Sequence, residues 1–238
     1  MDGLDTFMAA RQPTARRPLL GLTVLLVEDS RFACEAVRML CLRSGARIRR
    51  ADTLENARKH LSVYRPSVVL VDVGLPDGSG LALIETLAHG APPIDVVLGT
   101  SGDLDVENDV IAAGANGFLA KPIASLGAFQ SAILTHLPKD RQPPGPRLVT
   151  DEVITPDIVA FHDDLTHVAE VLRNTDDDKT VDYVTQFLGG VARSVDDEKL
   201  GRAVSRLAKL RKTGGPLSQG IAALTQEVDA RLASGGPI

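Results

Sequence analysis

Between Leu22 and Leu137, short β-branched runs alternate five times with longer stretches of helical periodicity. Repeated strand–helix units predict a parallel sheet covered by helices on both faces. The runs Val24–Val27 and Val68–Val71 are apolar throughout, as strands buried on both faces require. We therefore predict an α/β fold with a five-stranded, parallel, doubly wound sheet. The expected strands are 23–27, 47–51, 67–71, 95–99 and 117–120, and the expected helices are 31–44, 54–63, 80–88, 105–113 and 125–137.

The chain on either side of this alternation has a different character. Residues 1–20 are polar with two prolines, so we expect a flexible N-terminal arm, followed by the sheet domain over 21–137. Residues 138–150 begin with PKDRQPPGP, whose four prolines predict a stiff, extended linker. Residues 151–238 show apolar residues at spacings of three and four. They predict four short amphipathic helices forming a C-terminal all-α bundle.

Composition and charge exclude several classes of function. Aromatic residues make up 3% of the chain and there is no Trp, which argues against base-stacking platforms for single-stranded nucleic acid. The net charge is −5, and residues 151–238 hold 15 acidic and 10 basic residues. This balance opposes binding to a phosphate backbone. Five basic residues cluster over 202–212, which we interpret as a solvated helix face.

Two features of the sequence indicate the cellular compartment of the protein. Arg16 and Arg17 precede the apolar run Leu19–Val27, but this run is far shorter than the roughly 20 residues of a membrane span and has no cleavage site. Cys34 and Cys41 lie two turns apart on one expected helix, about 10 Å along its axis, which is too far for a disulfide. We expect a cytoplasmic protein with no membrane attachment.

Three carboxylates fall where predicted strands end. Glu28 and Asp29 follow the first strand, and Asp72 follows the third. Ligands of open parallel sheets bind beyond the carboxyl ends of the strands, where the strand order reverses. Carboxylates this close repel one another unless a cation is present, and oxygen ligands with room for water favour Mg²⁺. The sequence therefore predicts a Mg²⁺ site here.

The later strand ends supply complementary groups. A hydroxyl comes from Thr100 or Ser101, and Lys121 follows the fifth strand. A carboxylate nucleophile at Asp72, a metal, a hydroxyl and an ammonium group together suit phosphoryl transfer, because the cations neutralise charge on the transferred group.

The segments VLLVEDS, LVDVGLPDGSG, LGTSG and GANGFLAKP occur in this order. Over residues 22–137 the chain resembles the receiver domain of bacterial two-component response regulators, which has a flavodoxin-like fold. The resemblance implies that Asp72 accepts a phosphoryl group from a phosphohistidine. It also implies Mg²⁺ bound by Asp29, Asp72 and the main-chain carbonyl of Gly74, with Glu28 acting mainly through water.

The same resemblance assigns the switch residues. It implies that Lys121 contacts a phosphoryl oxygen, that the Lys121–Pro122 bond is cis, and that Phe118 is the aromatic switch residue. Either Thr100 or Ser101 fits the position of the switch hydroxyl, and we prefer Thr100. A receiver that binds partners without being phosphorylated is the alternative.

No family resemblance extends to residues 151–238, so the output is open. We predict a helical interaction or dimerisation domain that switches a downstream protein, with no enzymatic output. DNA-binding regulation is one alternative. A bundle of the histidine-phosphotransfer type is another, with His162 and His167 as its histidines. The expected phosphodonor is a sensor histidine kinase or a histidine phosphotransfer protein, and the chain could also form a homodimer.

Overall fold

The computed structural model describes residues 12–145, 149, 151–173 and 177–234. The chain divides into two compact units. The sheet unit comprises Met1–Asp29 and Ala36–Thr155, and the helical unit comprises Ser30–Glu35 and Pro156–Ile238. The short segment Ser30–Glu35 therefore groups with the helices of the C-terminal part.

The sheet unit is built on five parallel strands in the order β2-β1-β3-β6-β7. These strands are β1 (Thr23–Val27), β2 (Arg47–Ala51), β3 (Val68–Asp72), β6 (Val96–Ser101) and β7 (Gly117–Ala120). Every residue of β3 and β6 is buried, which explains why their apolar positions run without alternation. The predicted five-stranded parallel sheet is confirmed.

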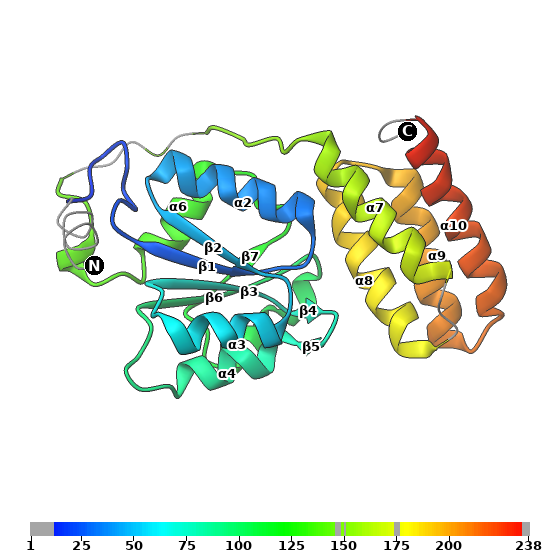
Figure 1. The fold of residues 1–238 in the computed structure, drawn as a ribbon, viewed down its shortest axis with the longest axis horizontal. Helices are drawn as coiled ribbons and strands as arrows, with labels where there is room; N and C mark the ends of the chain where they lie inside the picture. Colours follow the sequence, from blue (N-terminus) through cyan, green and yellow to red (C-terminus); the bar gives the residue numbers. More distant parts are fainter. Residues whose placement is uncertain (1–11, 146–148, 150, 174–176, 235–238) are drawn as a thin grey trace. The chain divides into compact units, whose positions relative to one another are not determined.

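Helices cover both faces of this sheet, with α2 and α6 on one face and α3 and α4 on the other (Figure 1). The helices of the sheet unit are α2 (Arg31–Ser44), α3 (Leu54–Val63), α4 (Gly80–Ala88), α5 (Glu107–Ala112) and α6 (Leu126–Leu134). From β1 the chain moves first to β2 and then to β3 on the other side of β1. The order therefore reverses between β1 and β3, and ligands of such sheets bind at the carboxyl ends of strands at this point.

A small antiparallel hairpin, β4 (Gly74–Leu75) with β5 (Gly78–Ser79), follows β3 and was not predicted. It leads into α4, whose first turn is capped by the Ser79 side chain, which accepts from the N–H of Leu81. Gly80 lies so close to β3 that a Cβ there would be 2.0 Å from the main-chain oxygen of Asp72. Only glycine allows this approach.

The expectation of a flexible arm over residues 1–20 is wrong for its described part, residues 12–20. Leu19 is fully buried, and its N–H donates to the carbonyl of Ser44 at 3.0 Å. Burial of the Leu19 side chain and this hydrogen bond together hold the segment against the sheet unit. Residues 1–11 lie outside the described residues.

The predicted extended linker over residues 138–150 also needs correction. Its first part packs on the sheet unit, where Arg141 forms an ion pair with Asp95 and donates to Ser67 Oγ at 3.2 Å. Gln142 Nε2 donates to the carbonyls of Leu134 and Leu137. These polar side chains find partners that the proline content does not reveal. Residues 146–148 and 150 lie outside the described residues.

The sheet unit continues further along the chain than expected. Ile154 is buried, and its N–H donates to the carbonyl of Ala124 at 2.9 Å. Val153 forms a β-bridge with Ser125. Residues 151–155, which we expected to begin the helical domain, therefore belong to the sheet unit.

The helical unit contains α7 (Ile158–Arg173), α8 (Asp178–Ser194), α9 (Glu198–Thr213) and α10 (Leu217–Ser234). The first of these helices begins at Ile158, where Asp157 Oδ1 accepts from the N–H of Val159 at 3.0 Å. Apolar stripes on the four helices converge on one core that includes Phe161, Leu165, Val168, Val184, Leu188, Leu207, Leu224 and Val228. Phe32 of α2 belongs to the same core, edge-on to Phe161.

A buried ion pair joins two helices of this unit. Asp197 caps α9 by accepting from the N–H of Leu200 at 2.9 Å. Both of its oxygens also accept from the fully buried Arg231 of α10, at 2.5 and 2.7 Å.

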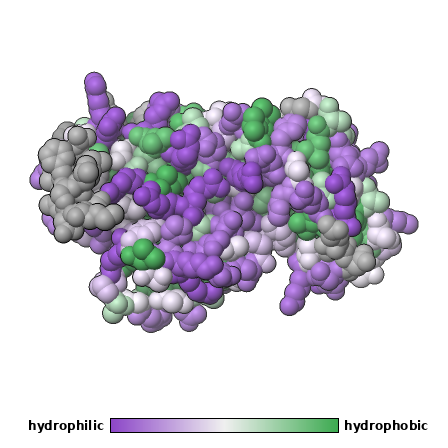
Figure 2. Space-filling model, viewed as in Figure 1, coloured by the Kyte–Doolittle hydropathy of each residue, from purple (hydrophilic) through white to green (hydrophobic). Residues whose placement is uncertain are grey.

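Hydrophilic residues dominate the face shown in Figure 2, and hydrophobic ones form small, scattered groups. Among the described residues, none of the helices has the length and apolar character needed to cross a membrane.

Candidate functional site

An acidic cluster forms where β1 and β3 end. Glu28 and Asp29 directly follow β1, and Asp72 is the last residue of β3. The two strands are neighbours in register, with Val27 beside Val71, so their ends meet. One carboxylate oxygen from each of the three acidic residues lies within 4.8 Å of the others. Glu28 and Asp72 are buried, at 2% and 6% exposed.

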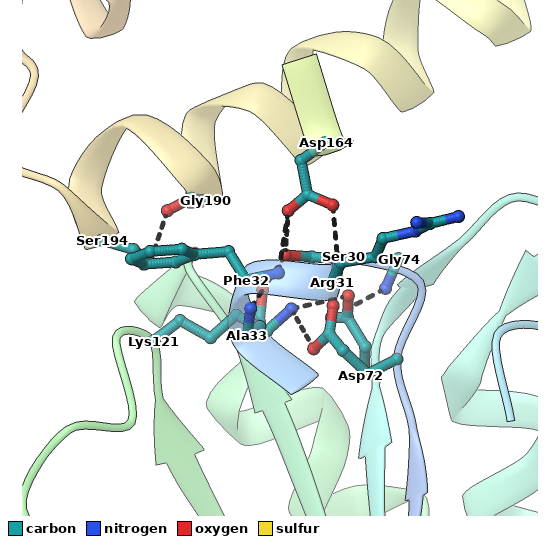
Figure 3. Close-up of polar contacts among 12 residues, drawn as sticks. Ser30, Arg31, Phe32, Ala33, Asp72, Gly74, Lys121, Asp164, Gly190 and Ser194 are labelled. Atoms are coloured by element: carbon teal, nitrogen blue, oxygen red, sulfur yellow. Dashed lines mark hydrogen bonds and ion pairs between the residues drawn. The ribbon is translucent and has the colours of Figure 1, made fainter. Parts of the chain in front are cut away.

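Lys121 extends into this cluster from the end of β7. Its Nζ lies 2.6 Å from Glu28 Oε2 and 2.8 Å from Asp72 Oδ2, and its side chain is 11% exposed (Figure 3). The Lys121–Pro122 peptide bond is cis, as the resemblance implied. One ammonium group therefore bridges two buried carboxylates.

Burial and mutual charge shift the titration of this cluster. Burial, reinforced by the negative charges of Asp72 and Asp29, raises the pKa of Glu28 to about 8, although Lys121 acts in the opposite direction. For Lys121, burial lowers the pKa, but the charges of Asp72 and Glu28 outweigh it and the pKa is raised. Lys121 therefore stays charged, yet its one positive charge does not keep Glu28 fully ionised.

The structure distinguishes the two candidate hydroxyls. Thr100 pairs with Asp72 across β6 and β3 and is fully buried. Within the described part of the chain, Thr100 Oγ1 has no hydrogen-bond partner. Ser101 Oγ, by contrast, accepts from the N–H of Asp103 at 3.1 Å. An unsatisfied buried hydroxyl is costly, so Thr100 is the better candidate for contacting a ligand.

Two further predicted site residues lie nearby in the fold. The N–H of Gly74 donates to Asp72 Oδ1 at 3.3 Å, and the role of its carbonyl stays a prediction. Phe118, in β7, is partly buried and packs against the core on the α3 and α4 side of the sheet. Its role as a switch also stays a prediction.

Sequence reasoning missed one buried carboxylate, which lies in the helical unit. Asp164 of α7 accepts from the main-chain N–H groups of Arg31 and Phe32, directly after Asp29 (Figure 3). The sequence contains a pattern from which Asp164 could have been identified. Asp164 lies three residues after Phe161 and four before Val168, so it falls on the apolar stripe of its helix. A charged residue at such a position needs a specific partner.

The arrangement favours one kind of chemistry. A carboxylate at a strand end, held by an ammonium group beside two further carboxylates and a buried hydroxyl, suits nucleophilic attack on an electrophile that carries several negative oxygens. The oxygen-only donor set of Glu28, Asp29 and Asp72 fits a small, hard divalent cation.

Comparison with known proteins identifies the family of this part of the chain. Residues 24–133 match the response regulator receiver domain family. This segment is a receiver domain of a two-component response regulator, and the resemblance noted in the sequence is confirmed.

Two curated proteins are similar to part of the chain. The KDP operon transcriptional regulatory protein KdpE of Escherichia coli (strain K12) is 30% identical over 141 residues, which are 58% of this chain and 61% of that protein. The transcriptional regulatory protein DpiA of the same organism is 33% identical over 106 residues, 43% of this chain and 47% of that protein. The chain thus spans less than two thirds of either relative.

Among solved structures, the signal receiver domain of the DNA binding response regulator protein (merR) from Colwellia psychrerythraea 34H is 23% identical. It covers 47% of this chain and 94% of its own, with a TM-score of 0.43.

Proposed function

We propose that the protein is a response regulator of a two-component phosphorelay, in which Asp72 accepts a phosphoryl group from a phosphohistidine. The observation that carries this proposal is the position of Lys121 Nζ, 2.8 Å from the Asp72 carboxylate, at the edge of the acidic cluster. A phosphohistidine of a sensor histidine kinase or of a histidine phosphotransfer protein is the donor.

The transfer follows from the groups present. A carboxylate oxygen of Asp72 attacks phosphorus and forms an O–P bond, while the N–P bond of the phosphohistidine breaks and its electron pair returns to the imidazole. Lys121 moves from the Asp72 carboxylate to an oxygen of the bound phosphoryl group and offsets its charge. The product is an aspartyl phosphate.

The residues fit Mg²⁺ by the chemistry of their donors. Three carboxylate oxygens lie within 4.8 Å of one another, and burial, reinforced by the charges of Asp72 and Asp29, raises the pKa of Glu28 although Lys121 acts in the opposite direction. Asp29, Asp72 and the main-chain carbonyl of Gly74 would hold the ion, with Glu28 acting mainly through water. Bound Mg²⁺ supplies positive charge to the oxygens of the transferred group.

Thr100 and Phe118 would transmit the phosphorylation of Asp72 to the surface of the receiver domain. The buried hydroxyl of Thr100 has no protein acceptor or donor among the described residues and lies in register with Asp72, so it is available to a phosphoryl oxygen. Movement of Thr100 toward this oxygen opens space into which Phe118 follows. The surface formed by α5, β7 and α6 then changes, which needs only a few kcal/mol of differential stabilisation.

Phosphoacceptance is tested by intact-mass measurement after incubation with acetyl phosphate. We expect one added phosphoryl group in the presence of Mg²⁺, and none in excess chelator or in the Asp72→Asn variant. Asp77→Asn is a matched control, because Asp77 lies nearby in sequence and caps α3 through the N–H groups of Leu54 and Glu55. Labelling that persists in Asp72→Asn would show that the acceptor is another residue.

We further propose that the output is a protein partner, which the helical unit and the α5-β7-α6 surface would engage. The acidic balance of residues 151–238 supports a protein target over nucleic acid. Two of the clustered basic residues of α9 also have intramolecular acidic partners. Arg202 pairs with Glu198, and Arg211 pairs with Asp178 and Asp182.

DNA-binding regulation is the second candidate, because KdpE and DpiA are named transcriptional regulatory proteins. A fluorescence titration against genomic DNA fragments at low salt separates the two candidates, with the receiver unmodified and phosphorylated. We expect no salt-sensitive binding in either state. Tight binding that is lost when Arg206, Lys209 and Arg211 are changed to Glu would establish DNA as the target.

A further inference from the structure

The first turn of α2 begins immediately after Asp29. The first N–H groups of any helix have no acceptor within the helix and need partners elsewhere. Ser30 supplies one partner, because its Oγ accepts from the N–H of Ala33 at 3.0 Å. The N–H groups of Arg31 and Phe32 still require acceptors, and the short loop that joins β1 to α2 does not provide them.

Asp164 of α7 provides both acceptors. Its Oδ1 accepts from the N–H of Arg31 at 2.7 Å, and its Oδ2 accepts from the N–H of Phe32 at 3.2 Å. Ser30 Oγ donates to the same Oδ2 at 2.6 Å. Figure 3 shows the carboxylate of Asp164 facing this turn, with the dashed lines converging on it. The side chain of a residue more than 130 positions away in the sequence thus completes the cap of α2.

Neighbouring contacts hold the same segment. Phe32 lies in the core of the helical unit, with its ring centroid 6.3 Å from that of Phe161 in an edge-on arrangement. Arg31 forms an ion pair with Asp163 at 2.7 Å, but both side chains are largely exposed, so this pair adds little. All these contacts lie within the helical unit, which includes Ser30–Glu35.

The burial of Asp164 shows that this arrangement is specific. The residue is 2% exposed, and burial raises the pKa of its carboxyl group even though Ser30 and the two N–H groups act in the opposite direction. A carboxylate in such surroundings is costly unless its hydrogen bonds are made with good geometry. The position of Ser30, Arg31 and Phe32 is therefore constrained by the carboxylate that they surround.

We propose that Asp164 is a positioning residue for the phosphoacceptor site. By holding the main chain of Ser30–Phe32, it sets the direction in which the chain leaves Asp29, and so the placement of that carboxylate in the acidic cluster. This inference rests on the proposed function of the cluster as a Mg²⁺-dependent phosphoacceptor site. Because coupling between two sites is reciprocal, Mg²⁺ bound at Asp29 must in turn strengthen the contacts of Asp164 with α2.

The test compares Asp164→Asn with Asp163→Asn in the full chain. Both variants remove one negative charge from the same turn of α7. Asp163 accepts from the exposed side chain of Arg31, whereas Asp164→Asn replaces a carboxylate oxygen that accepts from the main chain of α2 with an NH₂ group that cannot. We expect Asp164→Asn to raise the Mg²⁺ dissociation constant about three- to tenfold, somewhat less than for residues that contact a metal ligand directly. Asp163→Asn should change it less than about twofold, as for other exposed ion pairs.

Two readouts separate positioning from a loss of structure. Amide NMR titration with MgCl₂ gives the dissociation constant under conditions where circular dichroism shows each variant to be folded. The initial rate of labelling by acetyl phosphate should fall at low Mg²⁺ and recover at saturating Mg²⁺. A merely structural role would not produce this dependence on Mg²⁺ concentration.

The results of these measurements distinguish failure of the inference about Asp164 from failure of the proposed function. An unchanged Mg²⁺ affinity in folded Asp164→Asn, or an equal change in Asp163→Asn, would overturn the inference. If Asp164→Asn does not fold, Ser30→Ala takes its place, since it removes the hydroxyl that donates to Asp164, and the same loss of affinity is expected. A wild-type chain that binds Mg²⁺ but takes no phosphoryl group would refute the proposed function, whereas the comparison of Mg²⁺ affinities would still test Asp164.

Discussion

Lys121 bridges Asp72 and Glu28 with one ammonium group, at 2.8 and 2.6 Å. Two carboxylates that are almost inaccessible to solvent therefore contact the same ammonium group. Removal of the ammonium group or of a carboxylate leaves buried charge uncompensated. This is far more costly than the loss of an exposed ion pair. Lys121 thus stabilises the Mg²⁺-free fold, in addition to its proposed part in phosphoryl transfer.

Replacement of Lys121 by Met should lower the free energy of unfolding in the presence of chelator by about 3 kcal/mol, since it removes the ammonium group that both Glu28 and Asp72 contact. Excess Mg²⁺ should restore part of this loss by supplying positive charge. Urea unfolding with and without Mg²⁺ measures both effects. Lys59→Met, which breaks only the exposed pair with Glu55, should change stability by less than about 0.5 kcal/mol. Equal effects in the two variants would contradict the prediction.

Replacement of Thr100 by Val should separate stability from switching. The Oγ1 of Thr100 is buried without a hydrogen-bond partner among the described residues, so its removal should leave the free energy of unfolding unchanged or raise it by about 1 kcal/mol. The response to phosphorylation should nevertheless be lost, which NMR of Phe118 in the presence of an acyl-phosphate mimic would detect.

Ser101→Ala is the control for Thr100→Val. It removes the hydrogen bond from the N–H of Asp103, so it should destabilise the protein by about 1 kcal/mol. The shift of Phe118 on addition of the mimic should remain. The reverse result, a response that survives in Thr100→Val and disappears in Ser101→Ala, would identify Ser101 as the switch hydroxyl.

Replacement of Asp197 by Ala should be among the most damaging changes in the helical unit. It removes the cap of α9 and leaves Arg231, which is fully buried, without its bidentate partner. A loss of about 3–5 kcal/mol is expected from the broken pair, with about 1 kcal/mol more from the cap. Thermal unfolding followed by far-UV circular dichroism would measure this loss of stability. Arg202→Ala, which breaks an exposed pair with Glu198, should have almost no effect.

The thiol of Cys41 should be inert in the folded protein. Burial raises its pKa to about 12, so the thiol holds its proton until well above neutral pH, and the reactive thiolate is scarce at mildly alkaline pH. Cys34 is also buried. Ellman's reagent should therefore react slowly with the native chain and rapidly in guanidinium chloride. An exposed thiol introduced as Ser62→Cys is the positive control, and fast reaction of the native wild-type chain would contradict the prediction.

The proximity of Glu28, Asp29, Asp72 and Lys121 could be predicted from the sequence because each residue ends a strand. Parallel strands bring their carboxyl ends to one edge of a sheet, so residues from three strand ends far apart in the sequence can be placed together without any knowledge of side-chain packing. The choice between Thr100 and Ser101 could not be made in this way. It depends on which hydroxyl already has a partner, and the N–H of Asp103 is that partner for Ser101.

The boundaries of the sheet unit were harder to predict for a related reason. Prolines and polar residues over 138–146 favour an extended linker. In the structure, however, Arg141 forms an ion pair with Asp95, and Gln142 donates to the carbonyls of Leu134 and Leu137 at and just after the end of α6. The pair of Arg141 and Asp95 joins two ordinary polar residues that lie 46 positions apart in the sequence. Composition describes only the local preference of the backbone, and individual tertiary hydrogen bonds override it here.

The position of Phe32 has a consequence for chimaeras in which this receiver domain is exchanged for another. Phe32 precedes β2 in the sequence, yet its ring belongs to the core of α7–α10. A chimaera cut near Thr155 would give the helices a foreign receiver and leave a vacancy where this ring packs, at a cost of about 3–5 kcal/mol. A working graft must therefore transplant two pieces together, the long C-terminal segment and the six residues Ser30–Glu35.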